Sequence, residues 1–176
     1  MKHLTLFFAI TFCCSTLSAQ LVAKINPGGL LTATGSGSLE WFVSQRFSVQ
    51  LDGYLTPGTT KGDTEFAGGG AGVSARCYLG AADRPTGLFV SPFVAQHWVA
   101  FEDIRSVAYN YNFTALGGQV GYQLTINNIL TVELGCGAWA GLNVPTFKQA
   151  FGVGDYYGEG LKLWLNLGAG VAIWKK

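Results

Sequence analysis

Six charged side chains fall on the polar side of segments in which apolar and polar residues alternate. They are Lys24, Glu40, Asp52, Arg76, Glu133 and Lys162. Three positive and three negative charges in one interior would neutralise each other, whereas an unpaired buried charge is costly. Two interpretations follow. The six residues form a network of salt bridges that plugs a narrow interior, which is the reading we prefer, or they line a gated or ion-selective pathway.

His97 is the residue on which enzymatic chemistry would depend, because no other histidine follows residue 19. A serine-type hydrolase needs a base beside a nucleophile and an orienting acid. Ser91 shares the face of His97 by parity, but the two would lie about 20 Å apart along a strand. Only a serine from another strand could approach. We therefore expect an interfacial histidine beside Trp98 and Phe101 and no enzyme, with a lipid-acting hydrolase that uses His97 as the alternative.

Ligands for a metal or a cofactor are scarce. After residue 19 the sequence has Cys77 and Cys136, which fall on the apolar side of different segments, and one histidine. A transition-metal site would lack nitrogen and sulfur ligands. The glycine run at 68–72 is not followed by the Lys-Ser/Thr pair and helix of a phosphate loop. The sequence predicts no catalytic residue, no metal and no cofactor.

The composition limits what kind of chain positions these residues. Of 176 residues, 25 are glycine and only 12% are charged, against about 25% charged in ordinary soluble domains. The 11 Lys and Arg nearly balance the 10 Asp and Glu, and no basic block indicates nucleic-acid binding. The chain is therefore too poor in charge for an ordinary soluble domain.

The first nineteen residues have the pattern of a secretory signal peptide. A short basic start is followed by an apolar run at 4–14 and a small, polar stretch that ends at Ala19. The apolar run is too short to span a bilayer, which takes about 20 residues as a helix. We expect residues 1–19 to be the signal peptide and residues 20–176 to form one exported domain.

Alternation with a period of two dominates the exported part. From Leu161 to Ile173 aliphatic residues occupy every odd position, while Lys162, Trp164 and Asn166 begin the other face. A helix would not space them so. Similar segments predict eight strands, at 21–31, 36–43, 47–56, 66–80, 88–101, 111–126, 129–141 and 159–174. Apolar outer faces and small or polar inner faces predict an all-β, eight-stranded antiparallel up-and-down transmembrane β-barrel.

The connections between the expected strands alternate in length. Residues 44–46, 80–87 and 126–128 read as turns, whereas 57–65, 102–110 and 142–158 read as longer loops. Outer-membrane barrels place short turns in the periplasm and long loops outside, so both termini should be periplasmic. A surface partner, which the sequence does not identify, would meet these loops. The candidate contact residues in the last loop are Phe147, Lys148, Phe151, Tyr156 and Tyr157.

Two further expectations concern prolines and aromatic residues. Pro27 and Pro92 fall inside expected strands, where a local bulge would have to accommodate the missing N–H. Aromatic residues near expected strand ends fit the two girdles of a membrane barrel. They are Phe42, Phe47, Tyr54, Phe89, Trp98, Phe101, Tyr109, Tyr111, Phe113, Tyr156 and Tyr157.

Several short motifs together resemble a known protein family. They are Ser18-Ala19-Gln20, Lys24-Ile25-Asn26, Leu39-Glu40, Phe47-Ser48-Val49, Ala75-Arg76-Cys77-Tyr78-Leu79, Ser91-Pro92-Phe93 and Gly118-Gln119-Val120-Gly121-Tyr122-Gln123. The chain resembles the small outer-membrane β-barrel proteins of Gram-negative bacteria, especially OmpA-like barrels common in Bacteroidetes. The resemblance implies an eight-stranded barrel and brings no catalytic residue. It also implies insertion by the barrel assembly machinery, for which Trp174 would be the C-terminal aromatic signal.

The sequence therefore predicts an integral protein of the cell outer membrane, in contact with outer-membrane lipid and with its lumen plugged by side chains. A structural or surface-interaction role fits best, with the three loops as the contact surface. A narrow porin-like channel for ions or small solutes is the first alternative, and a lipid-modifying outer-membrane enzyme is the second.

Overall fold

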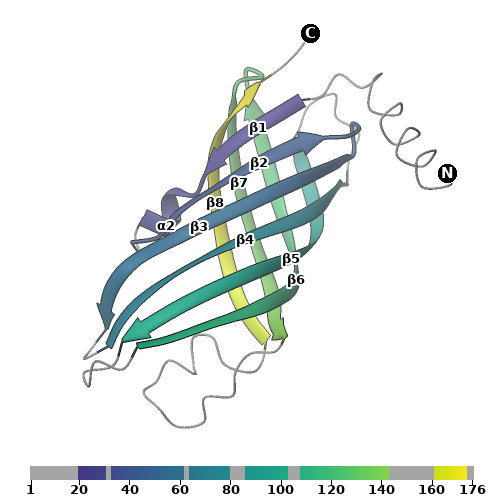
Figure 1. Cartoon of the computed structure of the whole chain (residues 1–176). Helices are drawn as coiled ribbons and strands as arrows, with labels where there is room; N and C mark the ends of the chain where they lie inside the picture. The colour runs from purple at the N-terminus through teal and green to yellow at the C-terminus, as the bar shows by residue number, and fades with distance from the viewer. Residues whose placement is uncertain are drawn as a thin grey trace, which may run out of the picture.

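The computed structural model describes residues 20–30, 33–61, 64–79, 86–102, 108–142 and 161–173. In this part of the chain eight antiparallel strands form one closed barrel in sequence order, and β8 pairs with β1 (Figure 1). The predicted fold class is confirmed. The strands are β1 (Gln20–Ile25), β2 (Gly35–Phe42), β3 (Phe47–Lys61), β4 (Thr64–Tyr78), β5 (Gly87–Glu102), β6 (Ala108–Ile126), β7 (Leu130–Leu142) and β8 (Leu161–Ile173).

Alternation along each strand decides which side chains enter the lumen. On β7, Thr131 and Glu133 are buried, whereas Leu130, Val132 and Leu134 are exposed on the outside. The other strands follow the same rule, so the outer surface is a continuous band of aliphatic residues. Such a band suits contact with lipid rather than with water. No helix among the described residues is long and apolar enough to cross a membrane.

The two ends of the barrel differ in their connections. At one end, here called the turn end, β2 joins β3 and β6 joins β7 through short turns. Asn127 and Asn128 adopt positive φ angles of 52° and 59°, a conformation that asparagine tolerates better than most residues. Leu21 pairs with Ile173, so both described ends of the chain lie at the turn end (Figure 1). The opposite end is called the loop end.

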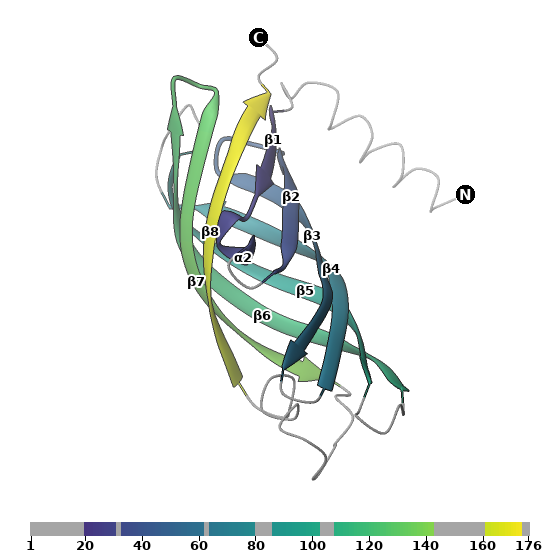
Figure 2. The same cartoon turned by 90° about the vertical axis from the view of Figure 1, so that its left-hand side faces the viewer.

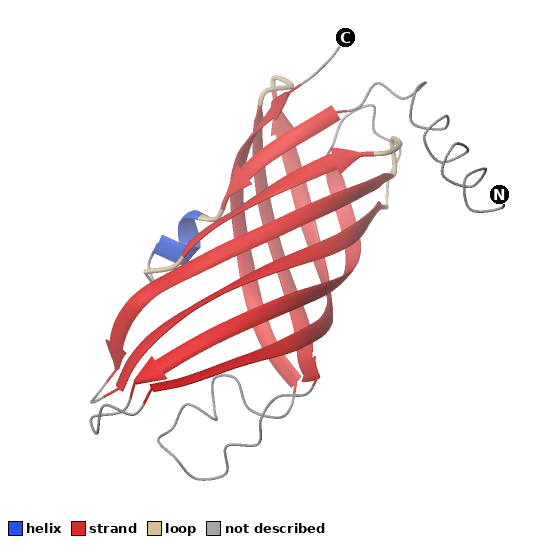
Figure 3. Cartoon of the chain, in the orientation of Figure 1, coloured by secondary structure: helices blue, strands red, loops and turns tan. Residues whose placement is uncertain are grey.

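The first strand is shorter than the sequence predicts. We expected a strand over 21–31, but β1 ends at Ile25 and a short helix, α2 (Pro27–Leu30), follows. Proline begins this helix because the first helical position needs no N–H donor. Figure 3 shows α2 as the one helix drawn among the strands. Pro92 behaves differently: it stays inside β5, and the residue pairs on either side of it, Ser74 with Phe93 and Cys77 with Val90, keep one register with β4, without a bulge.

The hairpins at the loop end have longer strands and shorter loops than the sequence predicts. Most of the predicted loop 57–65 belongs to β3 and β4, which pair from Thr59 to Phe66 after a register shift between Thr56 and Thr59. The Pro57-Gly58 pair therefore bulges the strand instead of ending it. The predicted loop 102–110 is likewise shortened, because Glu102 pairs with Ala108. Of the predicted loop 142–158, Leu142 belongs to β7, and the rest lies outside the described residues.

Two short strands leave the wall incomplete toward the loop end. β1 pairs with β8 only as far as Ala169, and β2 pairs with β3 only as far as Leu55. Beyond these points Leu161–Gly168 of β8 pair only with β7, and the end of β3, Thr56–Lys61, pairs only with β4, among the described strands. We call this interval the β3–β8 gap. Figure 2 shows α2 between β8 and β2 at the edge of this gap.

Candidate functional site in the barrel lumen

Four of the six predicted charges meet in the turn half of the lumen. The Lys24 ammonium lies 2.6 Å from a carboxylate oxygen of Glu40 and 2.6 Å from one of Glu133. Arg76 donates two hydrogen bonds to Glu133, at 2.6 and 3.0 Å. These residues come from β1, β2, β4 and β7 and are called the charge network. Two cations and two carboxylates balance within it.

Neutral side chains complete the charge network. Lys24 Nζ also donates to the amide oxygens of Gln50, at 3.2 Å, and Gln123, at 2.6 Å. Ser48 and Tyr78 donate to Glu40 Oε1, and Asn166 donates to Glu133 Oε1 at 2.7 Å. The four charged side chains are at most 3% exposed. Charges removed from water this completely need such partners, because ion pairing alone does not repay desolvation.

The sequence reasoning missed the two glutamines of the network. Gln50 and Gln123 carry no charge, so a search for ionisable residues passes over them. Period-two alternation does place both on the polar face, because Gln50 lies two residues from Asp52 and Gln123 four residues from Gln119. Which polar residues of different strands share a level of the barrel depends on the stagger between strands. The sequence pattern does not give that stagger.

Apolar side chains fill the lumen on the turn-end side of the network. The cluster of buried hydrophobic residues there consists of Val22, Phe42, Tyr78, Phe89 and Ala172. Phe89 is fully buried, and the guanidinium carbon of Arg76 lies 4.3 Å from its ring centroid. Such a contact between a cation and a desolvated ring is favourable. The charge network and this cluster together fill the turn half of the lumen.

The other two predicted lumen charges do not join the network. Asp52 accepts a hydrogen bond from the side-chain amide of Gln50 at 2.5 Å, and it is exposed to the space beyond. None of the described ion pairs includes Asp52. Lys162 lies near the other end of β8, opposite Trp139 in the ladder, and is half-buried. Of the three positive and three negative predicted charges, two of each therefore meet in the charge network.

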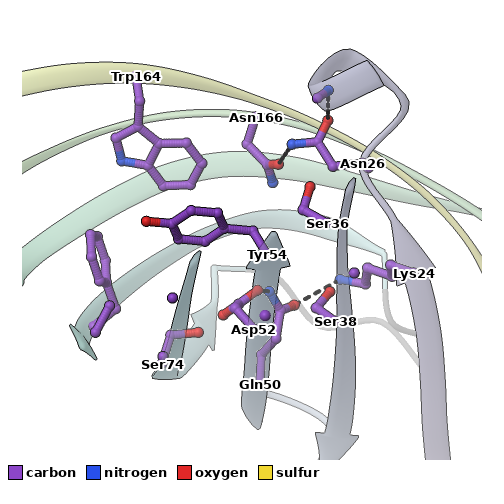
Figure 4. A pocket seen from close by; sticks show the side chains of 18 of the residues that line it. Lys24, Asn26, Ser36, Ser38, Gln50, Asp52, Tyr54, Ser74, Trp164 and Asn166 are labelled. Carbon is purple, nitrogen blue, oxygen red and sulfur yellow. Dashed lines mark hydrogen bonds between the residues drawn. The ribbon is translucent and has the colours of Figure 1, made fainter. Parts of the chain in front are cut away.

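The loop half of the lumen contains a partly open cavity of about 690 Å³. The prediction that side chains plug the whole lumen is wrong for this half. Figure 4 shows Ser36 and Ser38 of β2, Asp52 and Tyr54 of β3 and Trp164 of β8 around one space. Phe93, Ala95, His97, Gln119 and Trp139 also line it. We call this space the loop-half cavity; the charge network forms its floor through Lys24 and Glu133.

His97 lies inside the barrel and not in an outer aromatic girdle. Its ring stacks on Phe113, with centroids 4.7 Å apart, and on Trp139 at 5.7 Å. Its Nδ1 shares a 2.5 Å hydrogen bond with the hydroxyl of Tyr54. The interfacial position beside Trp98 is therefore wrong, because parity turns His97 inward and Trp98 outward. In the described contacts His97 meets aromatic rings, without the nucleophile and acid that a hydrolase needs.

Several other aromatic residues assigned to the girdles also point inward. Phe42, Phe89 and Phe113 are at most 5% exposed, and Tyr54 lines the loop-half cavity. Phe47 and Trp98 do face outward and are exposed. Nearness to a strand end therefore does not decide the side of the wall on which a ring lies; parity does.

No group of three potential metal-ligating side chains occurs among the described residues. Cys77 and Cys136 are free thiols on the outer face. The candidate contact residues of the last loop lie outside the described residues. They are Phe147, Lys148, Phe151, Tyr156 and Tyr157.

Comparisons with known proteins establish the fold. No protein-family model and no curated protein matches the chain. Among solved structures, it is similar to the N-terminal β-barrel domain of Pseudomonas aeruginosa OprF, with 13% identity, a TM-score of 0.62, and coverage of 88% of this chain and 96% of that one. It is also similar to Neisserial surface protein A (NspA), with 14% identity, a TM-score of 0.54 and coverage of 89% and 96%.

A third similar structure is Ail, the attachment invasion locus protein of Yersinia pestis, solved with the heparin analogue sucrose octasulfate. It shares 9% identity and a TM-score of 0.54, with coverage of 89% of this chain and all of that one. The recognition of the chain as a small outer-membrane type of eight-stranded barrel is confirmed at the level of fold.

Proposed function

We propose that this chain is an integral outer-membrane β-barrel whose turn half is sealed by the charge network and whose task is structural or one of surface interaction. The observation that carries the proposal is the fully buried network of Lys24, Glu40, Arg76 and Glu133, which joins four strands across the lumen. A barrel closed in this way holds loops at a membrane surface and conducts nothing.

The outer surface and the fold support the membrane location. The exposed faces of the strands are aliphatic, and the structural neighbours are outer-membrane barrels of the same strand number. In the proposed orientation the turn end faces the periplasm, and both termini lie there. The signal peptide at 1–19, the barrel assembly machinery, outer-membrane lipid and a Gram-negative source belong to the same proposal.

The loop end is the proposed contact surface. It includes the short connection at 103–107 and the long connection at 143–160, which holds Phe147, Lys148, Phe151, Tyr156 and Tyr157. Aromatic side chains of this kind are enriched at sites of protein recognition. No enzymatic activity is proposed, because the described contacts of His97 form a stack of rings.

The narrow channel is the less favoured function. The loop-half cavity is wide enough for a solute, but its floor is the charge network, and the apolar cluster lies behind that. Eight strands leave an interior that side chains can just fill. Conduction would require Arg76 and Glu133 to separate inside the lumen.

Single-channel recording in planar bilayers tests the seal. We expect no current steps from the wild-type barrel, because no open path crosses the charge network. A variant with Arg76→Ala, Glu133→Ala and Phe89→Ala, which opens both the charge network and the apolar cluster behind it, should show current steps. A control with Asp52→Ala and Lys162→Ala, which removes two lumenal charges outside the network, should stay silent. Steady conductance by the wild type would overturn the proposal, and silence of the network variant would overturn the network as the seal.

A further inference from the structure

The loop-half cavity has the size and the lining of a small-molecule site. Its volume of about 690 Å³ lies within the range of roughly 300–1,000 Å³ that ligand sites occupy. An interior of eight strands has room for its own side chains or for one small ligand. A space of this size beside a filled half therefore calls for a physical account of what occupies it.

One side of the cavity carries a carboxylate without a cationic partner. Asp52 projects from β3 and is exposed to the cavity, and its described hydrogen bond comes from the neutral amide of Gln50. The ammonium of Lys24, which also lines the cavity, is already shared between Glu40 and Glu133. Because the charge network balances by itself, Asp52 leaves the cavity and its floor with one net negative charge. An anionic ligand would be repelled there.

Two polar groups without a described hydrogen-bond partner belong to residues of the cavity lining, one on β4 and one on β8. Ser74 of β4 is 5% exposed, and its hydroxyl has no hydrogen-bond partner among the described residues. The indole N–H of Trp164 is likewise buried without a described partner. Buried polar atoms are nearly always hydrogen-bonded, to protein or to water. Both residues line the cavity, and rotation of the Ser74 side chain can present its hydroxyl to water or to a ligand.

Aromatic rings form the rest of the wall. Phe93 meets Trp164 edge to face, with centroids 6.2 Å apart, and Tyr54 packs beside His97 at 5.6 Å. In the view of Figure 4 the Tyr54 and Trp164 rings lie to the left of Asp52, and Lys24 lies to its right. Faces of aromatic rings attract organic cations, most strongly where water is excluded. The rings and the carboxylate therefore favour the same charge on a ligand.

We propose that the loop-half cavity binds a small organic cation that joins an ammonium group to an apolar ring or short chain. The ammonium pairs with Asp52 and hydrogen-bonds to Ser74, while the apolar part packs on Phe93 and Trp164. The sealed floor makes the cavity a binding site and not a passage. The proposal goes beyond the anchoring role, and it rests on the seal only for the distinction between a binding site and a passage.

Three probes with the same ring and a similar chain separate charge from size. They are 2-phenylethylamine, 2-phenylethanol and 3-phenylpropanoate, which are a cation, a neutral molecule and an anion at neutral pH. Binding is measured by saturation-transfer-difference NMR titration on the full barrel in phosphatidylcholine nanodiscs, with empty nanodiscs subtracted. We expect the amine to bind at least about tenfold more tightly than the alcohol, and the anion to bind most weakly.

Two variant pairs locate the binding. Asp52→Asn should lower the affinity for the amine about tenfold and leave the alcohol within about twofold, whereas Asp52→Glu should retain the preference for the amine. Ser38→Trp should fill the cavity and abolish binding. Its control, Leu39→Trp, places the same ring on the outer face of the same strand. Circular dichroism and the heat-modified migration of the barrel on gels verify that each variant folds.

The results that would overturn the site are specific. Equal affinity for the three probes would remove the role of charge. Unchanged amine binding in Asp52→Asn would remove the carboxylate, and unchanged binding in Ser38→Trp would place the amine outside the cavity. None of these outcomes bears on bilayer conductance, so a failure here is distinguishable from a failure of the sealed-lumen proposal.

Discussion

The turn half and the loop half of the lumen are built from the same strands and end in different states. β3 contributes Gln50 to the charge network and, two residues further, Asp52 to the loop-half cavity. In the turn half all eight strands are present, and their inward side chains fill the space. In the loop half β1 ends at Ile25 and β2 reaches only to Gly35, while β4 offers Gly70 and Gly72 to the lumen.

This comparison shows what empties a narrow barrel. The lumen of an eight-stranded barrel is filled by a set of inward side chains at each level, so two short strands and two glycines leave a hole. A larger residue would also be crowded at Gly72, because a Cβ there would lie 3.0 Å from the Cβ of Ala95. The hollow half is therefore set by strand length and residue size, and the filled half by charge pairing.

The largest expected difference between the halves concerns charge removal. Glu133→Ala leaves Lys24 and Arg76 buried with one carboxylate fewer, and should lower the free energy of unfolding by about 3–5 kcal/mol. Asp52→Ala, in the loop-half cavity, should cost less than about 1 kcal/mol, because it removes a single, partly buried hydrogen bond. Urea unfolding of the barrel in lipid vesicles, followed by tryptophan fluorescence, measures both. Equal losses of unfolding free energy in the two variants would contradict the division into a turn half stabilised by charge pairing and a hollow loop half.

Ring truncation should separate the halves by a smaller margin. Phe89 is fully buried against Arg76 and Tyr78, so Phe89→Ala should cost about 3–4 kcal/mol. Phe93, four residues along the same strand, lines an existing cavity, and Phe93→Ala should cost about 1–2 kcal/mol because less packing is lost. The same unfolding experiment compares them. A larger loss at Phe93 would mean that the cavity is closed and packed in solution.

The smallest expected effect concerns added volume. A Cβ on Gly121 would lie 2.6 Å from Cζ of Phe89 and 2.8 Å from the carbonyl oxygen of Leu134. Gly121→Ala should therefore destabilise the barrel by about 1–3 kcal/mol through overpacking. On the outer face of the same strand, a Cβ on Gly118 would meet only the Ser91 carbonyl oxygen at 3.8 Å. Gly118→Ala should leave the unfolding midpoint nearly unchanged, and a comparable loss there would point to a backbone effect of alanine itself.

Most of the fold could be predicted from the sequence because period-two alternation is a local signal. Leu161 to Ile173 shows it without a break, and the structure places that strand within two residues of the expected start and one of the expected end. Prolines led us to place strand ends wrongly in both directions. Pro27 ended a strand that we had continued, and Pro57 was absorbed by a bulge in a strand that we had ended.

The sequence predicts which side chains of the site face the lumen, but not at which height along the barrel axis they lie. Parity placed all six charges on the lumenal side, but which of them touch depends on how far neighbouring strands are shifted along each other. Lys24 reaches Glu133 because β1 and β7 lie on either side of β8, with Gly170 and Gly168 between the two side chains. The cavity was unpredictable for the same reason, because it depends on where two strands stop.

The shortness of β1 also has a consequence for how the barrel comes together. The β1–β8 ladder joins five residue pairs, from Leu21 and Ile173 to Ile25 and Ala169, whereas the β5–β6 hairpin joins sixteen. Hairpins close short loops, but this ladder must bring together the two ends of the chain, which costs more entropy and slows its formation. The β1–β8 ladder is therefore both the shortest and the last to form, and under mechanical load the barrel would open first between these two strands.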